Sequence, residues 1–215
     1  MILSINVQEG RNIGELQNAL ASIGAQFVIP LQHTLYFSGA ITQQSVHNIR
    51  SIVLDAIKQN ASSIKLVFSS EGGDLNAGLS LYHFLRALPI PLTIHNFGTI
   101  ESIAVLIYMA ADTRLVTDDA WFLVHSFNAY FYSNNIDYPR LSERTQSLGQ
   151  YADVYTKIIN ERTKGAKSPL DISKVLNGEA IIVDASTATN AGIATSITPT
   201  TGVVSNSEVN WYVNP

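Results

Sequence analysis

Hydrophobic positions along the chain follow two alternating spacings. Short runs rich in β-branched residues predict strands, and between them apolar residues recur three and four positions apart, which predicts amphipathic helices. This alternation is typical of an α/β domain built from β-α-β units. We expect strands at residues 26–29, 34–38, 63–68, 92–96, 113–116 and 121–125. We expect helices at residues 12–23, 42–59, 76–87, 102–111, 139–163 and 186–191.

The predicted helices differ in how they can be buried. The helix at 42–59 has an apolar face wide enough to cover a sheet. The helix at 139–163 is more polar and its apolar stripe is narrower, so we expect it to project from the domain and to contact another subunit. The residues expected between subunits are Tyr151, Tyr155 and Ile159. The polar segment 198–215, with Trp211 and Tyr212, is either a frayed end or a docking segment.

The composition narrows the class of protein. A chain of 215 residues with 46% hydrophobic content fits one globular domain. A net charge of −4 without a run of Lys or Arg argues against a nucleic-acid partner. The absence of cysteine excludes disulfides and thiolate metal sites. Because the chain begins without a secretory signal pattern and its longest apolar run, 103–111, is too short to span a bilayer, we expect a cytoplasmic protein with no membrane partner.

Ser102 is the residue that most directly suggests chemistry. It lies between the strand at 92–96, which we expect a turn at 98–101 to follow, and an uncharged apolar helix. A helix start presents free N–H groups and the positive end of the helix dipole, which together favour an anion formed beside the hydroxyl. The alternative is that Ser102 only caps the helix, since serine is a preferred N-cap residue.

Two further features are candidate partners for Ser102. Gly72 and Gly73 follow the strand at 63–68, and glycine there can turn a backbone N–H into a cleft; an ordinary strand-to-helix turn is the alternative. His125 ends an otherwise apolar strand. It is a candidate general base, and the alternative is a histidine that is simply buried in the core. Neither a phosphate-binding glycine motif nor a zinc-type histidine pair occurs, so we predict no metal and no cofactor.

Taken in order, these segments resemble the catalytic subunit of the caseinolytic (Clp) protease family. Thr34-Leu-Tyr-Phe-Ser-Gly-Ala-Ile41 is similar to the family's first core strand with its glycine. Ser69-Ser-Glu-Gly-Gly-Asp74 and the residues after it are similar to S-P-G-G-x-x-x-A-G, with Glu71 in place of proline. Gly98-Thr-Ile-Glu-Ser-Ile-Ala104 resembles G-x-A-A-S-M-G, with Glu101 in place of a small residue and Ala104 in place of a glycine.

The resemblance implies an α/β fold of the ClpP/crotonase type, a ββα spiral with a protruding handle helix at 139–163. It also implies the residue roles: Ser102 as nucleophile, His125 as general base, and the N–H groups of Gly73 and Ile103 as the oxyanion hole. The third member of the triad stays open. The family's aspartate aligns without gaps on Ala180, and one residue of slack gives Glu179; the alternatives are Asp171 and Asp184, of which Asp184 also looks like the N-cap of the last helix.

The function implied is an ATP-dependent Clp-type serine endopeptidase that hydrolyses a peptide or unfolded protein substrate inside a homo-oligomeric ring. We expect a divergent segment at 1–33, the peptidase domain at 34–197 and the polar tail at 198–215. Because residues before 34 do not resemble the family's axial loop, partnership with an AAA+ unfoldase is left open. The rival hypotheses are a catalytically silent assembly subunit and a crotonase-type acyl-CoA enzyme, for which Glu101 is the candidate carboxylate.

Overall fold

The computed structural model describes residues 31–128, 137–199 and 209–214. The strand predicted at 26–29 and the helix predicted at 12–23 lie outside these ranges. The strands are β1 (Gln32–Ser38), β2 (Ser63–Ser70), β3 (Leu92–Glu101), β4 (Thr113–Thr117), β5 (Trp121–Val124), β6 (Ile181–Asp184), β7 (Ser196–Thr198) and β8 (Val209–Tyr212). The helices are α2 (Gln43–Lys58), α3 (Leu75–Arg86), α4 (Ile103–Tyr108), α5 (Tyr138–Arg162), α6 (Ile172–Leu176) and α7 (Ala185–Asn190).

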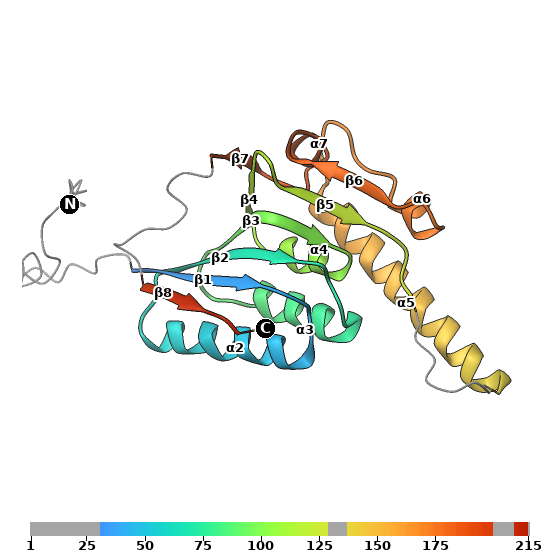
Figure 1. Cartoon of the computed structure of the whole chain (residues 1–215), viewed down its shortest axis with the longest axis horizontal. Helices are drawn as coiled ribbons and strands as arrows, with labels where there is room; N and C mark the ends of the chain where they lie inside the picture. The colour runs from blue at the N-terminus through green and yellow to red at the C-terminus, as the bar shows by residue number, and fades with distance from the viewer. Residues whose placement is uncertain (1–30, 129–136, 200–208, 215) are drawn as a thin grey trace, which may run out of the picture. The chain divides into compact units, whose positions relative to one another are not determined.

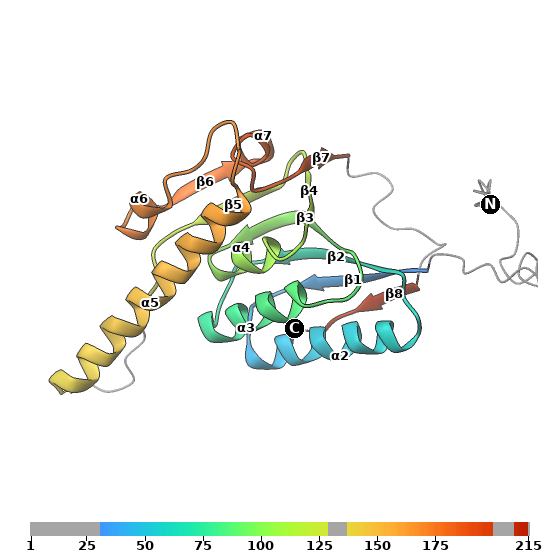
Figure 2. The same cartoon turned by 180° about the vertical axis from the view of Figure 1, so that it is seen from behind.

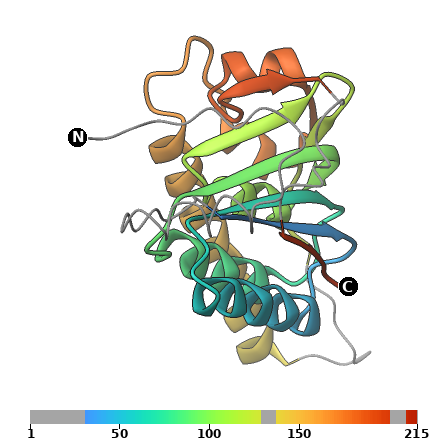
Figure 3. The ribbon, with the colours of Figure 1, turned by 90° about the vertical axis from the view of Figure 1, so that its left-hand side faces the viewer.

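The described strands form one sheet in the order β6-β5-β3-β2-β1-β8, and β4 pairs with both β3 and β7. Every pairing is parallel except that between β5 and β6. Figures 1 and 2 show α2, α3 and α4 lying along one face of this sheet. Figure 3 shows the strands changing direction from one to the next, the twist common to such sheets. Since β2, β3 and β5 are parallel, the segments that follow them emerge at the same edge.

The helices on this face begin where the sequence carries capping residues. Thr42 precedes α2 and forms a capping box with Ser45, and the Asp74 carboxylate accepts a hydrogen bond from the Ala77 N–H at the start of α3. Both helices bury an apolar face, as their spacing predicts. The buried residues of α2 include Val46, Ile49 and Val53.

Strand β3 extends five residues beyond the predicted strand at 92–96 and ends next to Ser102. The segment 98–101, predicted as a turn, remains in the sheet: it pairs with β5, with Thr99 opposite Trp121. An irregularity between Phe68 and Ser70 shifts the register of β2 against β3. The extension matters because it attaches Ser102 directly to a strand end.

The long helix α5 confirms the helix predicted at 139–163 to within one residue at each end. Its first part projects beyond the sheet in Figure 1, with Tyr138 82% exposed and Leu141 47% exposed. The prediction that Tyr155 and Ile159 lie between subunits is wrong, because both are at least 98% buried within their own chain. They belong to the part of α5 that packs on the domain. The apolar stripe of the helix is narrow because only this part of α5 is buried.

A buried arginine joins several chain segments at the far end of α4. Arg114 is 6% exposed, and its guanidinium donates hydrogen bonds to the carbonyls of Ile193 (2.7 Å), Ala111 (2.8 Å) and Gly192 (3.0 Å). Arg162, the last residue of α5, donates from Nε to the Met109 carbonyl at 2.9 Å and from Nη2 to the Ala111 carbonyl at 2.6 Å. The carbonyls after α4 and α7 are thereby satisfied by charged donors.

The expected polar tail contributes a strand. Of the segment 198–215, β8 pairs in parallel with β1, and the Trp211 Nε1–H donates to His33 Nδ1 at 3.0 Å. The Tyr212 ring stacks on Tyr36 with 5.3 Å between centroids. For residues 209–214 the structure therefore favours docking over fraying.

Within the described ranges, no helix combines the length and apolar character needed to cross a bilayer.

Candidate active site

Ser102 occupies a strained turn between β3 and α4. Its backbone has φ 54° and ψ −126°, values close to those of the first central residue of a type II′ turn, where glycine is preferred. The hydroxyl makes no capping hydrogen bond, although Ser102 is the N-cap residue of α4. The interpretation of Ser102 as a simple helix cap is therefore not supported. Backbone strain of this kind is concentrated at functional sites.

The Ser102 backbone is held from two neighbouring elements. Its N–H donates to the carbonyl of Leu123 in β5 at 2.9 Å. Its carbonyl accepts a hydrogen bond from the Tyr155 hydroxyl of α5 at 3.2 Å. Burial raises the pKa of Tyr155, so this hydroxyl stays a donor at any physiological pH. These anchors fix the strained turn, and Tyr155 is a site residue that sequence reasoning assigned to a subunit interface instead.

The glycine pair after β2 lies against this turn. A Cβ on Gly72 would stand 2.9 Å from the Ser102 Cβ, and one on Gly73 would stand 2.3 Å from the Ile41 carbonyl oxygen. Both residues also have positive φ, 88° and 145°. Only glycine fits either position, which confirms that the pair is there for close backbone approach rather than for chain flexibility alone.

Two backbone donors are free beside Ser102. The bridge between Ile41 and Gly73 uses the N–H groups of Ile41 and Asp74, at 2.7 and 2.8 Å, so the Gly73 N–H points away from β1. Ile103 is the first residue of α4 and its N–H has no helical partner. Within the described part of the chain neither N–H donates a hydrogen bond. Unpaired donors at a helix start are suited to a developing oxyanion.

His125 directly follows β5, at the same edge of the sheet as Ser102. Its Nδ1 lies 2.6 Å from the carbonyl oxygen of Ser126. A carbonyl can only accept, so Nδ1 carries the proton and Nε2 keeps the lone pair that a base requires. In the described residues no hydrogen bond joins the Ser102 hydroxyl to His125. The β3–β5 register, with Glu101 opposite Leu123, brings the two residues to the ends of neighbouring strands.

The candidate acids are engaged elsewhere or exposed. Asp171 caps α6 and Asp184 caps α7, the latter accepting from the Thr187 N–H at 2.7 Å as the sequence predicts. Hydrogen bonds from Ser173 to Asp171 and from the Thr187 backbone to Asp184 lower the pKa of each carboxyl. Glu179 is exposed. Among the described residues, none of these three carboxylates bonds to His125.

Glu101, the unusual residue before the nucleophile, is half-buried at the end of β3. Its Oε1 accepts a hydrogen bond from the Thr99 hydroxyl at 3.1 Å.

Within the described ranges no group of three His, Asp or Glu side chains gathers in a way that could hold a metal ion.

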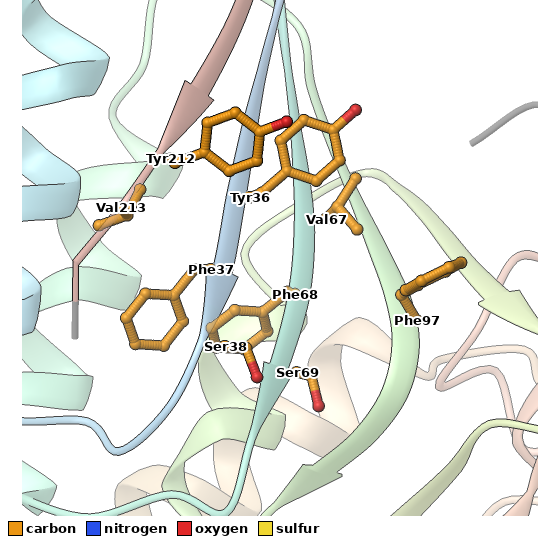
Figure 4. Close-up of a pocket in the computed structure, with 9 residues that line it drawn as sticks. All are labelled: Tyr36, Phe37, Ser38, Val67, Phe68, Ser69, Phe97, Tyr212 and Val213. Atoms are coloured by element: carbon orange, nitrogen blue, oxygen red, sulfur yellow. The ribbon is translucent and has the colours of Figure 1, made fainter. Parts of the chain in front are cut away.

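A separate pocket of about 430 Å³ opens over β1, β2, β3 and β8. Figure 4 shows its aromatic wall, with the Tyr36 and Tyr212 rings side by side and Phe97 across from them. It contains neither Ser102 nor His125, so it is distinct from the candidate active site. Its lining residues are Tyr36, Phe37, Ser38, Val67, Phe68, Ser69, Phe97, Tyr212 and Val213.

A serine on a strained turn, unpaired backbone N–H groups and a histidine thus lie at one edge of a mainly parallel sheet. The family model for Clp protease matches residues 28–201. The chain therefore belongs to the Clp protease family. Its structure is similar to that of a point mutant of ClpP1 from Listeria monocytogenes, with a TM-score of 0.66 and 15% sequence identity over 86% of this chain and 96% of that chain. Among curated proteins, no sequence matches the chain.

The structural likeness confirms the predicted ClpP fold, in which α5 corresponds to the expected handle helix. It covers nearly the whole of the other chain. The identity of 15% means that the likeness concerns the fold, so the roles of individual residues are argued from the site itself.

Proposed function

We propose that this chain is a serine peptidase that hydrolyses peptide bonds through an acyl-enzyme on Ser102. The observation that carries the proposal is the Ser102 turn itself: a strained backbone, a hydroxyl released from capping, and free N–H groups on Gly73 and Ile103. Strain is maintained only where the surrounding structure enforces it, as the anchors from Leu123 and Tyr155 do here.

The chemistry follows from these groups. His125 Nε2 takes the proton of the Ser102 hydroxyl as Oγ attacks the substrate carbonyl, and the resulting oxyanion is bound by the Gly73 and Ile103 N–H groups. The imidazolium then gives its proton to the leaving amine as the C–N bond breaks, leaving an ester on Ser102. Water, deprotonated by His125, hydrolyses that ester and restores the hydroxyl.

The mechanism requires His125 and Ser102 to come into hydrogen-bond contact when substrate binds. Such bonds are often long in free enzymes and tighten in the substrate complex. Their absence here is also the observation that favours the second candidate, a catalytically silent ClpP-like subunit. Nothing favours the acyl-CoA alternative, because the Glu101 carboxylate is already bonded to Thr99.

A serine-directed fluorophosphonate separates the two candidates. We expect the wild type to be labelled and to cleave a short fluorogenic peptide, and Ser102→Ala to lose both activities, with turnover falling by about 10⁴ to 10⁶. Ser51→Ala is the matched control, because this serine is exposed on α2 and has no role in the mechanism. Equal labelling of the wild type and Ser102→Ala, or none of either, would refute the peptidase proposal.

We further propose that the protein works in the cytoplasm as a homo-oligomeric ring that encloses peptide or unfolded protein substrate. The exposed first part of α5 supports this, since Tyr138 and Leu141 are large apolar side chains left uncovered by their own domain. Dependence on an AAA+ unfoldase is a separate question for experiment. A short peptide should be cleaved without ATP, and a folded protein only when such an unfoldase and ATP are added.

A further inference from the structure

The orientation of a catalytic histidine depends on the group bonded to the nitrogen that faces away from the nucleophile. In His125 that nitrogen is Nδ1, and its partner is the backbone carbonyl of Ser126 at 2.6 Å. A carboxylate normally does this work in a serine triad, by fixing the tautomer and stabilising the imidazolium. The carbonyl performs the first task completely, because it can accept only from a protonated Nδ1.

Strand register indicates why no carboxylate is present. In the antiparallel pair β5–β6, Val124 lies opposite Ile181. His125 and Ala180 directly follow and precede this last pair, and continuing the register past the strand ends would set His125 opposite Ala180 and Ser126 opposite Glu179. Because side chains alternate between the faces of a sheet, that register assigns Ala180 to the face of His125 and Glu179 to the other. The position that this register pairs with His125 carries a methyl group in place of a carboxylate.

The neighbouring acids offer no substitute. Glu179 is exposed and, within the described part of the chain, bonds to nothing; Asp171 and Asp184 cap helices. Glu101 lies on the adjoining strand opposite Leu123, two positions from His125, and its carboxylate is bonded to Thr99.

We propose that the Ser126 carbonyl replaces the triad carboxylate, so that the site is a Ser102–His125 dyad oriented by the main chain. The inference rests on the proposed peptidase function. A neutral dipole stabilises an imidazolium less than a full negative charge does. Ala180 is consequently the position at which a carboxylate would complete the triad, and Glu179 is dispensable.

The test combines spectroscopy with kinetics on the full-length chain. With ¹⁵N-labelled histidine, two-bond ¹H–¹⁵N correlation should show neutral His125 protonated on Nδ1. In Ala180→Asp we expect kcat for a short peptide to rise by about tenfold or more. Ala180→Asn is the matched neutral control and should not show this rise, and Glu179→Gln should behave as the wild type.

A complementary variant weakens the proposed bond directly. Incorporating the α-hydroxy analogue of Phe127 converts the Ser126 carbonyl into an ester carbonyl, a poorer acceptor. We expect His125 to populate both tautomers and kcat to fall by about tenfold. This readout is specific, since a merely structural role for the segment would leave the tautomer unchanged.

Opposite results would overturn the inference. If Glu179→Gln reduces kcat by 100-fold, a carboxylate is the partner after all; if neutral His125 is protonated on Nε2, the carbonyl bond is absent. Failure of the peptidase proposal is distinguishable, because an inactive and unlabelled wild type would still report the His125 tautomer and its change on the ester substitution at Phe127.

Discussion

Replacing Ser102 by glycine should abolish activity and at the same time stabilise the protein. The prediction follows from the backbone of Ser102, whose φ of 54° and ψ of −126° suit glycine better than any residue with a Cβ. Ser102→Ala is the matched comparison, because it removes the same hydroxyl and keeps the strained backbone. Since that hydroxyl makes no capping bond, we expect Ser102→Ala to stay within about 0.5 kcal/mol of the wild type.

The magnitude can be worked from three contributions. A non-glycine residue in this conformation costs about 3 kcal/mol, the upper end of the range for backbone strain. The greater conformational entropy of glycine in the unfolded chain reduces this gain by roughly 0.7 kcal/mol. Loss of the buried methyl group of alanine reduces it by about 0.8 kcal/mol more, because position 102 is only 8% exposed. The net gain of about 1.5 kcal/mol corresponds to a rise in Tm of roughly 3 to 6 °C.

The assay is urea unfolding of both variants at one protein concentration, so that assembly contributes equally to each. Fluorophosphonate labelling in parallel should show both to be inactive. If Ser102→Gly is no more stable than Ser102→Ala, the turn stores no strain and the argument that links strain to function at this residue fails.

Three further predictions test other parts of the structure. Gly73→Ala should destabilise the protein and should lower kcat of the folded fraction by 100-fold or more, because the new Cβ would meet the Ile41 carbonyl at 2.3 Å and displace the Gly73 N–H; a variant with full activity would exclude this donor from the oxyanion hole. Burial, aided by the nearby Lys65 charge, lowers the pKa of His95 to about 4. Between about pH 6.5 and 4 the unfolded chain binds a proton at this histidine and the folded chain does not. The free energy of unfolding of the wild type should therefore fall by about 3 kcal/mol more than that of His95→Gln over this range, as measured by urea unfolding at each pH. Parallel curves for the two proteins would contradict the assignment. Replacing both Tyr138 and Leu141 by Ser should reduce oligomer mass in light scattering without changing the helical signal of the protomer, and an unchanged mass would show that this end of α5 lies outside the subunit contacts.

Local signals in the sequence were sufficient for most of the central elements. The apolar runs of β1 to β5 and the periodic apolar residues of α2 and α3 predict those elements closely, and the Gly72–Gly73 and Ser102 segments, which the sequence marks separately, lie against each other in the structure. Gly98 misled the prediction at the end of β3, because a glycine there normally indicates a turn. Pairing with β5 outweighs that preference and carries the strand on to Glu101.

Other features depend on contacts that no local pattern encodes. Strand β8 is four residues long, and its pairing with β1 joins segments about 175 positions apart in the chain, which only the folded structure reveals. Tyr151 and Tyr155 both belong to the apolar stripe that the sequence shows on this helix. In the structure only Tyr155 is fully buried, and its hydroxyl donates to the Ser102 carbonyl. The Ser126 carbonyl is a main-chain atom, so no residue type could have indicated its bond to His125.

The hydrogen bonds of α5 have a mechanical consequence for the nucleophile. Side chains of α5 donate hydrogen bonds at both ends of α4. The Tyr155 hydroxyl donates to the Ser102 carbonyl at its start, and Arg162 donates to the Met109 and Ala111 carbonyls just past its end. Through these bonds α5 and α4 share a set of main-chain anchors. A displacement of α5 would therefore have to break them or carry the Ser102 carbonyl with it, which couples the position of Ser102 to whatever covers the projecting part of α5.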